Sequence, residues 1–305
     1  MSLSLLNQIV VIFLLAAAGY AARKSNILNQ QTQLGLSNIV LNLAIPASIL
    51  ASAAKPLEAK NFTVVITILI GAVVYYLFSI FMANLLSRLM KLPRGRGTIF
   101  TLLVAFANVA FIGYPVISIF LPENGIFFAS FYVIIFNLSF FTYGVATTST
   151  GEKLSPLAIF GNINNIAAFV MVVLYLLQIR FPAPVQQTLE LLGNLSTPLS
   201  MLVIGSMLAT IKLRQLFATP TLYFISFLRL LVLPTLVFLV LRWLGITGDA
   251  ATVLLIVSGL PSASVTVMIA EKNNAEPEYA TKGVLLSTIL FMATVPYLAF
   301  LHGLL

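Results

Sequence analysis

The sequence predicts an all-α membrane protein with ten transmembrane helices arranged as two inverted five-helix repeats. Its residues are 60% hydrophobic and only 8% charged, whereas soluble domains contain about 25% charged residues. Apolar runs long enough to cross a bilayer recur from one end of the chain to the other. Prolines interrupt these runs at corresponding places in the two halves, and this correspondence predicts the repeat.

The apolar runs define the expected helices, because a transmembrane helix needs about 17–25 mostly apolar residues. The expected spans are 5–22, 32–53, 62–86, 98–120, 126–148, 156–179, 188–210, 219–243, 249–270 and 281–303. No positive region precedes the first run, and Arg23 and Lys24 follow it, so we expect a retained helix and not a signal peptide. The segment TSTGEKLSP marks the boundary between the halves. The predicted organisation is a first repeat (1–148), a short cytoplasmic linker (149–155) and a second, inverted repeat (156–305).

The basic residues predict the orientation of the helices, because cytoplasmic loops of membrane proteins are enriched in Lys and Arg. One set of alternate loops holds Arg23, Lys24, Arg88, Lys91, Arg94, Arg96, Lys153, Lys212, Arg214, Lys272 and Lys282. The other set holds only Lys55, Lys60, Arg180 and Arg242. We therefore expect a multi-pass protein of the plasma membrane with both termini extracytoplasmic. An even number of spans agrees with this, since it places both termini on one side.

The same composition argues against several classes of function. The net charge of +8 comes from basic residues scattered between apolar runs, not gathered on one face as nucleic-acid binding requires. There is no cysteine, and His302 is the single histidine, so we expect no metal site and no cofactor. No Asp or Glu falls within the interior of an expected span, so we expect neither an enzyme nor a carboxylate proton relay. A receptor would not need matched helix breaks, and we expect no soluble output domain.

Two pairs of prolines occupy corresponding positions in the two halves. Pro46 in span 2 corresponds to Pro198 in span 7, and Pro115 in span 4 corresponds to Pro261 in span 9. Because five is an odd number of spans, the second half must be inserted upside-down relative to the first. Matched interrupted helices in two inverted halves are the best sequence indication of a transporter's binding site. A simple proline kink remains the alternative, more so for the pair in spans 2 and 7.

The stretch ANVAFIGYPV, residues 107–116, places an asparagine, a glycine and a proline inside an apolar span. Proline lacks a backbone donor and clashes with the carbonyl four residues earlier, and lipid offers no partner for the freed backbone groups. If spans 4 and 9 break and cross near the bilayer centre, their half-helix N-termini would face one cavity. Such ends carry positive partial charge and unpaired N–H groups, which would bind an anion such as a carboxylate.

Several polar residues accompany these breaks and are candidates for substrate binding. The candidates are Asn108, Gly113, Pro115, Asn137, Arg229, Pro261, Ser262 and Ser264, and the expected helix-break residues are Pro46, Pro115, Pro198 and Pro261. Asn108 could bind a carboxylate or cap a half-helix, since an uncompensated amide in a bilayer is costly. The serines could instead bond the preceding turn, and Asn137 could serve helix packing. Arg229 could offset the substrate's charge, snorkel, or cap a neighbouring helix end.

The residues around the breaks resemble the auxin efflux carrier family, which includes plant PIN-type carriers and bacterial relatives described as malate or malonate permeases. The resemblance spans nearly the whole chain and is strongest in GLPSASVTVMIAEKNNAEPEYATKGVLLSTILFMATVPYL, residues 259–298. The family's Pro-Asn-Thr followed by Gly-x-Pro is matched at Asn108, Gly113 and Pro115. Ala107 and Val109 stand where Pro and Thr are common, which weakens the case for auxin as the substrate.

The resemblance implies a scaffold of helices 1, 2, 6 and 7 that forms a homodimer. It also implies a transport domain of helices 3–5 and 8–10, which slides with an organic anion in an elevator movement. The substrate site would lie at the crossing of helices 4 and 9. We therefore expect a secondary transporter that exports a small organic anion, and no cofactor. The alternative is a proton- or sodium-coupled importer of a dicarboxylate such as malate or malonate, since Asn, Ser and broken-helix carbonyls can also hold sodium.

Overall fold

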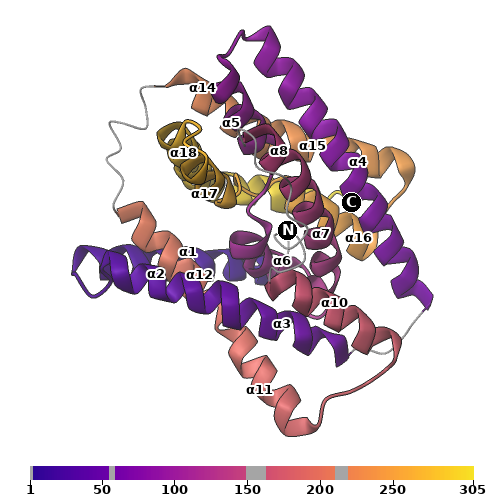
Figure 1. The fold of residues 1–305 in the computed structure, drawn as a ribbon. Helices are drawn as coiled ribbons and strands as arrows, with labels where there is room; N and C mark the ends of the chain where they lie inside the picture. The colour runs from indigo at the N-terminus through magenta and orange to yellow at the C-terminus, as the bar shows by residue number, and fades with distance from the viewer. Residues whose placement is uncertain (1–2, 55–58, 149–162, 210–218) are drawn as a thin grey trace. The chain divides into compact units, whose positions relative to one another are not determined.

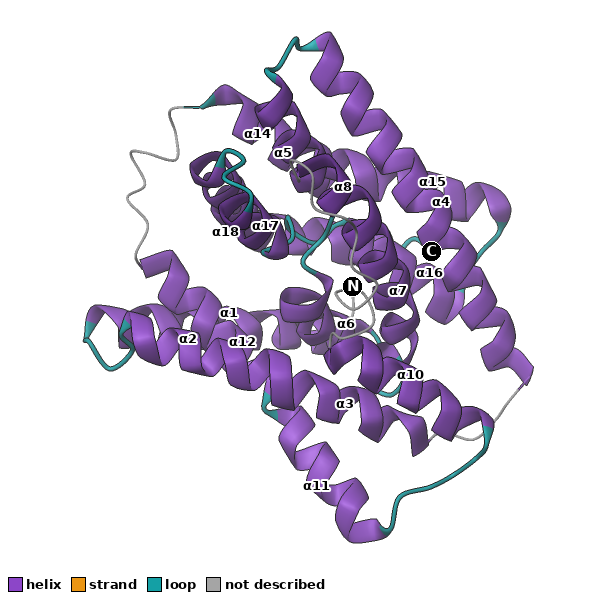
Figure 2. Ribbon diagram, in the orientation of Figure 1, coloured by secondary structure: helices purple, strands orange, loops and turns teal. Residues whose placement is uncertain are grey.

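The computed structural model describes residues 3–54, 59–148, 163–209 and 219–305. Within these ranges the chain consists of helices and the loops between them (Figures 1 and 2). The expected all-α class is therefore confirmed for the described part of the chain. The expected linker at 149–155 lies outside the described residues.

In the first half of the chain, the described residues form both continuous helices and helices that change type or break along their length. Their bounds are α1 Leu3–Lys24, α2 Gln30–Ile39, η1 Val40–Ala44, α3 Ile45–Ala51, η2 Ser52–Ala54, α4 Ala59–Leu89, α5 Arg94–Ala105, η3 Val109–Gly113, α6 Tyr114–Phe120, α7 Gly125–Ser139, η4 Phe140–Gly144 and α8 Val145–Thr148. Here η1, η3 and η4 are π-helical turns and η2 is a 3₁₀ turn.

The second half repeats this mixture of continuous and interrupted helices. Its elements are α10 Ile163–Leu176, α11 Ala183–Asn194, α12 Ser196–Ala209, α14 Pro220–Phe227, η5 Leu228–Val232, α15 Leu233–Leu244, α16 Gly248–Ser258, α17 Val265–Lys272 and α18 Pro277–His302. The turn η5 is π-helical and joins α14 to α15 without a break.

Several helices have the length and apolarity to cross a membrane. Among the described residues six do so: Gln30–Ala54, Asn61–Leu89, Gly125–Thr148, Ala183–Ala209, Pro220–Leu244 and Pro277–His302. Shorter apolar helices cover Val109–Phe120, Ile163–Leu176 and Gly248–Ser258. Large apolar side chains such as Leu77, Phe81 and Trp243 are exposed, which suits contact with lipid tails. The count of ten spans and their inverted repeat remain predictions.

Three of the π-helical turns share one relation to proline. The turns η1, η3 and η5 each end two residues before a proline, at Pro46, Pro115 and Pro234. A proline ring clashes with the carbonyl four residues earlier, and a widened turn moves that carbonyl away while the helix continues. Pro198 lies in the first turn of α12, just after α11 ends at Asn194. Pro296 lies inside α18, which continues through it.

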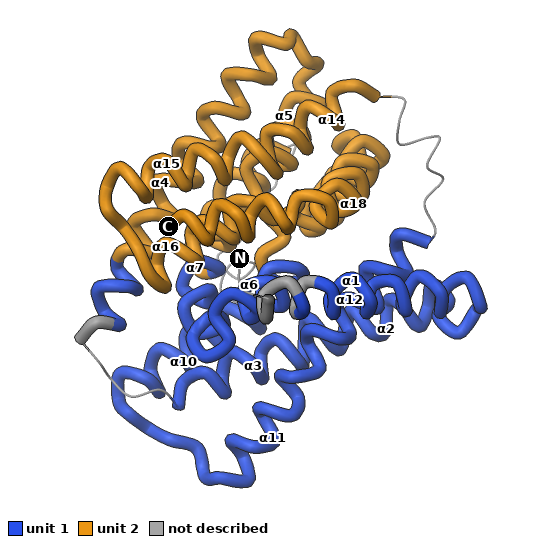
Figure 3. The backbone as a smooth tube through the Cα atoms, turned by 180° about the vertical axis from the view of Figure 1, so that it is seen from behind, with its two compact units in different colours: residues 1–66, 110–133, 160–211 blue, residues 67–109, 134–159, 212–305 orange. Residues whose placement is uncertain are grey.

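The chain divides into two compact units that are interleaved in sequence (Figure 3). Unit 1 comprises residues 1–66, 110–133 and 160–211, and unit 2 comprises residues 67–109, 134–159 and 212–305. Each unit therefore draws on both halves of the chain. The boundaries 1–148 and 156–305 accordingly remain a prediction about the repeat and do not describe compact units.

Unit 1 is organised around the close pairing of α1 and α12, and α3 packs against α10 and α11. The backbones of α1 and α12 approach so closely that a Cβ atom on Gly205 would lie 1.8 Å from the carbonyl oxygen of Ala16. A Cβ atom on Gly19 would lie 2.1 Å from the carbonyl oxygen of Leu202. Small residues permit such contact between membrane helices, so these two glycines fix how α1 and α12 pack.

Unit 2 is organised around α18, which packs against α5, α14 and α17, while α16 packs against α15. Gly283 of α18 brings this helix close to α5, because a Cβ atom there would lie 2.4 Å from Cδ1 of Leu103. The helices α5 and α16 both end inside this unit, at Ala105 and Ser258, and their buried ends form the candidate site.

Candidate functional site

Two interrupted helices meet in unit 2 and satisfy each other's backbone. The chain between α5 and η3 runs antiparallel to the chain between α16 and α17, with Ala107 paired to Ser262 as an isolated β-bridge. The backbone N–H of Asn108 donates to the carbonyl of Pro261 at 2.8 Å, and the N–H of Ala263 donates to the carbonyl of Phe106 at 2.9 Å. Lipid could not supply these partners, so each break provides backbone partners that the other needs.

Side chains from the breaks add further contacts. The Nδ2 of Asn108 donates to Oγ of Ser264 at 2.8 Å, and Asn108 is only 7% exposed. The hydroxyl of Ser262 donates to the carbonyl of Leu103 at 2.7 Å, and its backbone N–H donates to Oγ of Ser287 at 3.1 Å. The structure therefore brings together four candidates from the sequence, namely Asn108, Pro261, Ser262 and Ser264.

Arg229 joins this cluster from η5 and is fully buried. Its Nε donates to the carbonyl of Leu260 at 2.8 Å, and its Nη2 donates to the carbonyl of Val257 at 3.1 Å. Its Nη1 donates to the carbonyls of Val104 and Ala105 at 3.1 and 3.4 Å. These carbonyls belong to the ends of α5 and α16, so the guanidinium caps both helices, one of the roles that the sequence left open.

Tyr75 of α4 completes the environment of the guanidinium. Its hydroxyl accepts a hydrogen bond from Nη1 of Arg229, and the guanidinium carbon lies 5.8 Å from the centre of the tyrosine ring. The sequence analysis did not identify this residue. A tyrosine pair in the middle of an apolar span, Tyr75 and Tyr76, is the signal that could have indicated it, because buried Tyr hydroxyls usually find a partner.

An aromatic cluster packs beside the break. The ring of Phe106 stacks on that of Tyr76, with centroids 5.2 Å apart. It also contacts Phe136 and Phe140 edge-on, at 5.9 and 5.1 Å. The break is therefore covered by aromatic rings on this side.

The second half of the broken span 9 begins at the cluster. Helix α17 starts at Val265, with Ser264 in the N-cap position and no side-chain capping bond. The first-turn amides of Thr266 and Val267 donate to the carbonyls of Ala263 and Ser264, both at 3.0 Å, and the N-terminus of a helix carries positive partial charge. Thr266, in this first turn, is fully buried, and its hydroxyl has no partner among the described residues. This end of α17 is the part of the cluster best suited to an anion.

The remaining candidates lie elsewhere. Gly113 ends η3 and Pro115 lies at the start of α6, both within the chain segment 110–133 of unit 1. Asn137 is buried in α7 within unit 2. Pro46 and Pro198 belong to unit 1, where each lies beside a change in helix type or a helix end.

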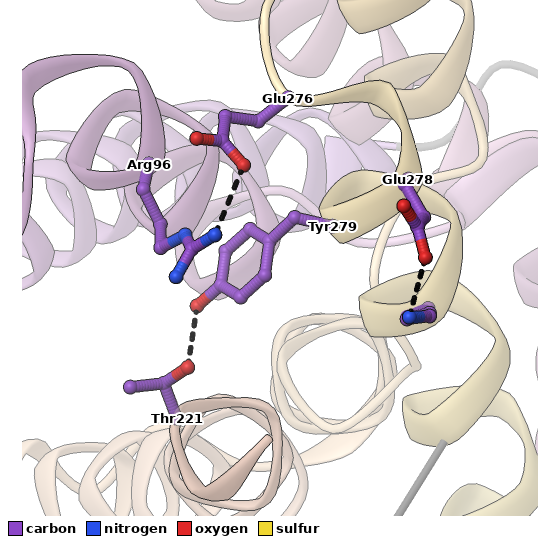
Figure 4. A network of polar contacts seen from close by, with 6 residues as sticks. Arg96, Thr221, Glu276, Glu278 and Tyr279 are labelled. Atoms are coloured by element: carbon purple, nitrogen blue, oxygen red, sulfur yellow. Dashed lines mark hydrogen bonds and ion pairs between the residues drawn. The ribbon is translucent and has the colours of Figure 1, made fainter. Parts of the chain in front are cut away.

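A second polar cluster connects the starts of three helices of unit 2 (Figure 4). Nη2 of Arg96, on α5, lies 3.3 Å from Oε2 of Glu276, just before α18. The guanidinium also lies over the ring of Tyr279, 5.2 Å from its centre. The Tyr279 hydroxyl donates to Oγ1 of Thr221, on α14, at 3.0 Å. This cluster holds the near end of α5, whose far end forms the break capped by Arg229.

Apolar helices of membrane-spanning length, combined with two breaks that satisfy each other in a buried cluster, define a helical membrane protein of the transporter class. The family model described as "Membrane transport protein" matches residues 4–165 and 153–299. The chain therefore belongs to this membrane transport protein family, and the resemblance to the auxin efflux carriers is confirmed.

Two archaeal relatives agree with this assignment. An uncharacterized transporter of Methanothermobacter thermautotrophicus is 25% identical over 295 residues, which cover 95% of this chain and 96% of the relative. An uncharacterized transporter of Methanocaldococcus jannaschii is 22% identical over 298 residues, which cover 95% of this chain and 96% of the relative. The chain is thus a membrane transporter, and its family is not a class of enzymes.

Proposed function

We propose that the protein exports a small organic anion that carries a carboxylate, and that it binds this substrate at the paired breaks of spans 4 and 9. The observation that carries the proposal is the antiparallel pairing of residues 106–108 with residues 261–263. This pairing places Asn108 against Ser264 at the start of α17. A helix N-terminus attracts anions, and the opposite partial charge of the two helix C-termini is already compensated by Arg229.

The cluster residues then have distinct roles. The Asn108 amide and the hydroxyls of Ser264 and Thr266 are the groups that would meet the carboxylate. Ser262 holds the break together through its bond to Leu103. The substrate-site role of Gly113, Pro115 and Asn137 remains a prediction from the sequence and is not part of this proposal.

The division into units supports an elevator movement. Unit 1 holds the expected spans 1, 2 and 7 and nearly all of span 6, and unit 2 holds most of span 3 and spans 8 to 10, whereas spans 4 and 5 are divided between the two units. Unit 1 would be the scaffold, paired with a second copy through helices 1, 2, 6 and 7, and unit 2 would move with the substrate. In the plasma membrane, a potential of 100 mV contributes about 2.3 kcal/mol per charge moved, which favours export of an anion from a negative-inside cell.

The proposal is tested with purified protein in liposomes on a solid-supported membrane. The currents evoked by malate, malonate, lactate, citrate and indole-3-acetate are compared with that of a cation, with and without sodium and a pH gradient. Asn108→Ala should reduce the anion current roughly tenfold or more, the effect of losing a hydrogen bond to a charged group. Asn61→Ala is the matched control, because Asn61 is also a buried amide, bonded to the Tyr175 hydroxyl at 3.3 Å away from the breaks.

The possible outcomes separate the alternatives. An anion current that needs neither sodium nor a pH gradient supports the exporter, and one that requires either of them supports the coupled dicarboxylate importer. An Asn108→Ala current equal to that of the wild type contradicts the placement of the site. Where no current is seen, counterflow of radiolabelled anions is measured. Absence of counterflow as well contradicts anion transport.

A further inference from the structure

The paired helix ends of unit 2 create an electrostatic problem of their own. The helices α5 and α16 both terminate at the breaks, and each C-terminus carries roughly half a negative charge on its unpaired carbonyls. Carbonyl oxygens at unwound helix ends are the groups with which transporters hold a coupling cation such as Na⁺. Without a counter-charge, this part of the break would attract a cation.

Arg229 fills that position with a covalently attached cation. Its donors reach carbonyls of both ends, Val104 and Ala105 on one side and Val257 and Leu260 on the other. The planar guanidinium presents five donors in a fixed fork. Its full positive charge is about equal to the two half charges that it faces. The cluster is therefore balanced without an ion from solution.

The surroundings of Arg229 show that it is committed to this position. The side chain is fully buried, and its nitrogens are engaged by backbone carbonyls and by the Tyr75 hydroxyl. Its own backbone lies in the π-helical turn η5, and such turns often occur at functional sites. Arg229, Tyr75 and the four carbonyls all belong to unit 2, so the cation would move with the helix ends that it neutralises.

We propose that Arg229, held by Tyr75, is a tethered cation that takes the place of a coupling ion, so that transport of the anion requires neither Na⁺ nor H⁺. This inference rests on the proposed function of an organic-anion transporter. Arg229 is a positioning residue: it neutralises the C-terminal helix ends and leaves the N-terminal end of α17 to bind the substrate. The carrier then moves only the charge of the anion in each cycle.

The test compares Arg229→Ala, Arg229→Lys and Tyr75→Phe with the wild type. Wild-type transport should be the same in sodium and in choline, and the same with and without a pH gradient. Arg229→Ala should lower transport by roughly tenfold to a hundredfold, the effect of losing hydrogen bonds to a charged group.

Added guanidinium should restore part of the transport of Arg229→Ala. It should also raise the thermal unfolding temperature of the variant, a readout that does not depend on transport. Arg229→Lys should transport faster than Arg229→Ala but more slowly than the wild type, because an ammonium keeps the charge but lacks the fork of donors.

The matched control is Arg242→Ala. Arg242 lies on α15 and also donates to a backbone carbonyl, that of Leu304 at 2.7 Å, but it is exposed. This variant should transport as the wild type does and should not respond to guanidinium. If Arg229→Ala does not fold, Arg229→Lys and Tyr75→Phe carry the comparison.

Each contrary result has a separate meaning. Wild-type anion transport that requires sodium or a proton gradient overturns the tethered-cation proposal and leaves anion transport intact. Failure of guanidinium to change either the transport or the unfolding temperature of Arg229→Ala also overturns it. Absence of anion flux from the wild type, in current and in counterflow, instead overturns the proposed function.

Discussion

At the scale of single residues, the polar groups of this chain are placed where the backbone needs them. Asn108 and Ser262 contribute to holding the two breaks together, and Arg229 caps both helix ends. The sequence indicated Asn108, Ser262 and Arg229 because each is costly in a bilayer without a partner. The tyrosine pair at positions 75 and 76 signals that a buried hydroxyl needs a partner, but the sequence does not say that this partner is Arg229, because packing sets the register between distant helices.

The closest backbone contact in unit 1 provides a prediction at this scale. Gly205→Ala should destabilise the protein by about 1–3 kcal/mol, because the added Cβ would lie 1.8 Å from the Ala16 carbonyl oxygen. The change is measured as a lower thermal unfolding temperature in detergent.

Gly35→Ala is the control for this substitution, since nothing lies within 4 Å of the position that its Cβ would take. Gly35 lies within α2, where alanine should stabilise by about 0.5–1 kcal/mol. Equal unfolding temperatures for the Gly205 and Gly35 variants would show that α1 and α12 can separate without cost.

At the scale of elements, hydropathy and proline predict different things. Apolar runs indicated where helices lie, because burial in lipid demands about 20 apolar residues. They could not distinguish a continuous helix from a π-helical turn, since both are equally apolar. Pro296 is tolerated within α18, whereas Pro234 follows η5. The type of helix around a proline therefore depends on whether the neighbouring groups leave room for the displaced carbonyl or donate a hydrogen bond to it.

The relation between proline and the π-helical turn leads to a prediction for η5. Pro234→Ala removes the ring that excludes an ordinary turn, and loss of the extra residue would rotate Arg229 by about 100° relative to α15. Anion transport should then fall roughly tenfold or more, as for other displaced site residues. The measurement is the anion current of this variant beside that of Pro296→Ala, which should be unchanged. A wild-type current from Pro234→Ala would show that the contacts of Arg229, and not the proline, maintain the turn.

At the scale of the whole molecule, the family and the all-helical class could be predicted from the chain, whereas the compact units could not. The units interleave residues from both halves, because helices distant in sequence pack together once they are in the membrane. Charge, by contrast, acts before packing: Lys and Arg bias the side on which each loop remains during insertion. The orientation is therefore the whole-molecule property that the sequence predicts most directly.

That orientation is tested by labelling, because the chain contains no cysteine and every introduced one is unique. Ser25, Gln178 and Asn274 are exposed residues in three loops between helices. The loops of Ser25 and Asn274 carry Lys24 and Lys272 and should be cytoplasmic, whereas the loop of Gln178 carries Arg180 and should face outside. In intact cells a membrane-impermeant maleimide should therefore label Gln178→Cys, and it should reach Ser25→Cys and Asn274→Cys only after permeabilisation. The opposite pattern would place both termini in the cytoplasm and would contradict the orientation predicted from the Lys and Arg residues.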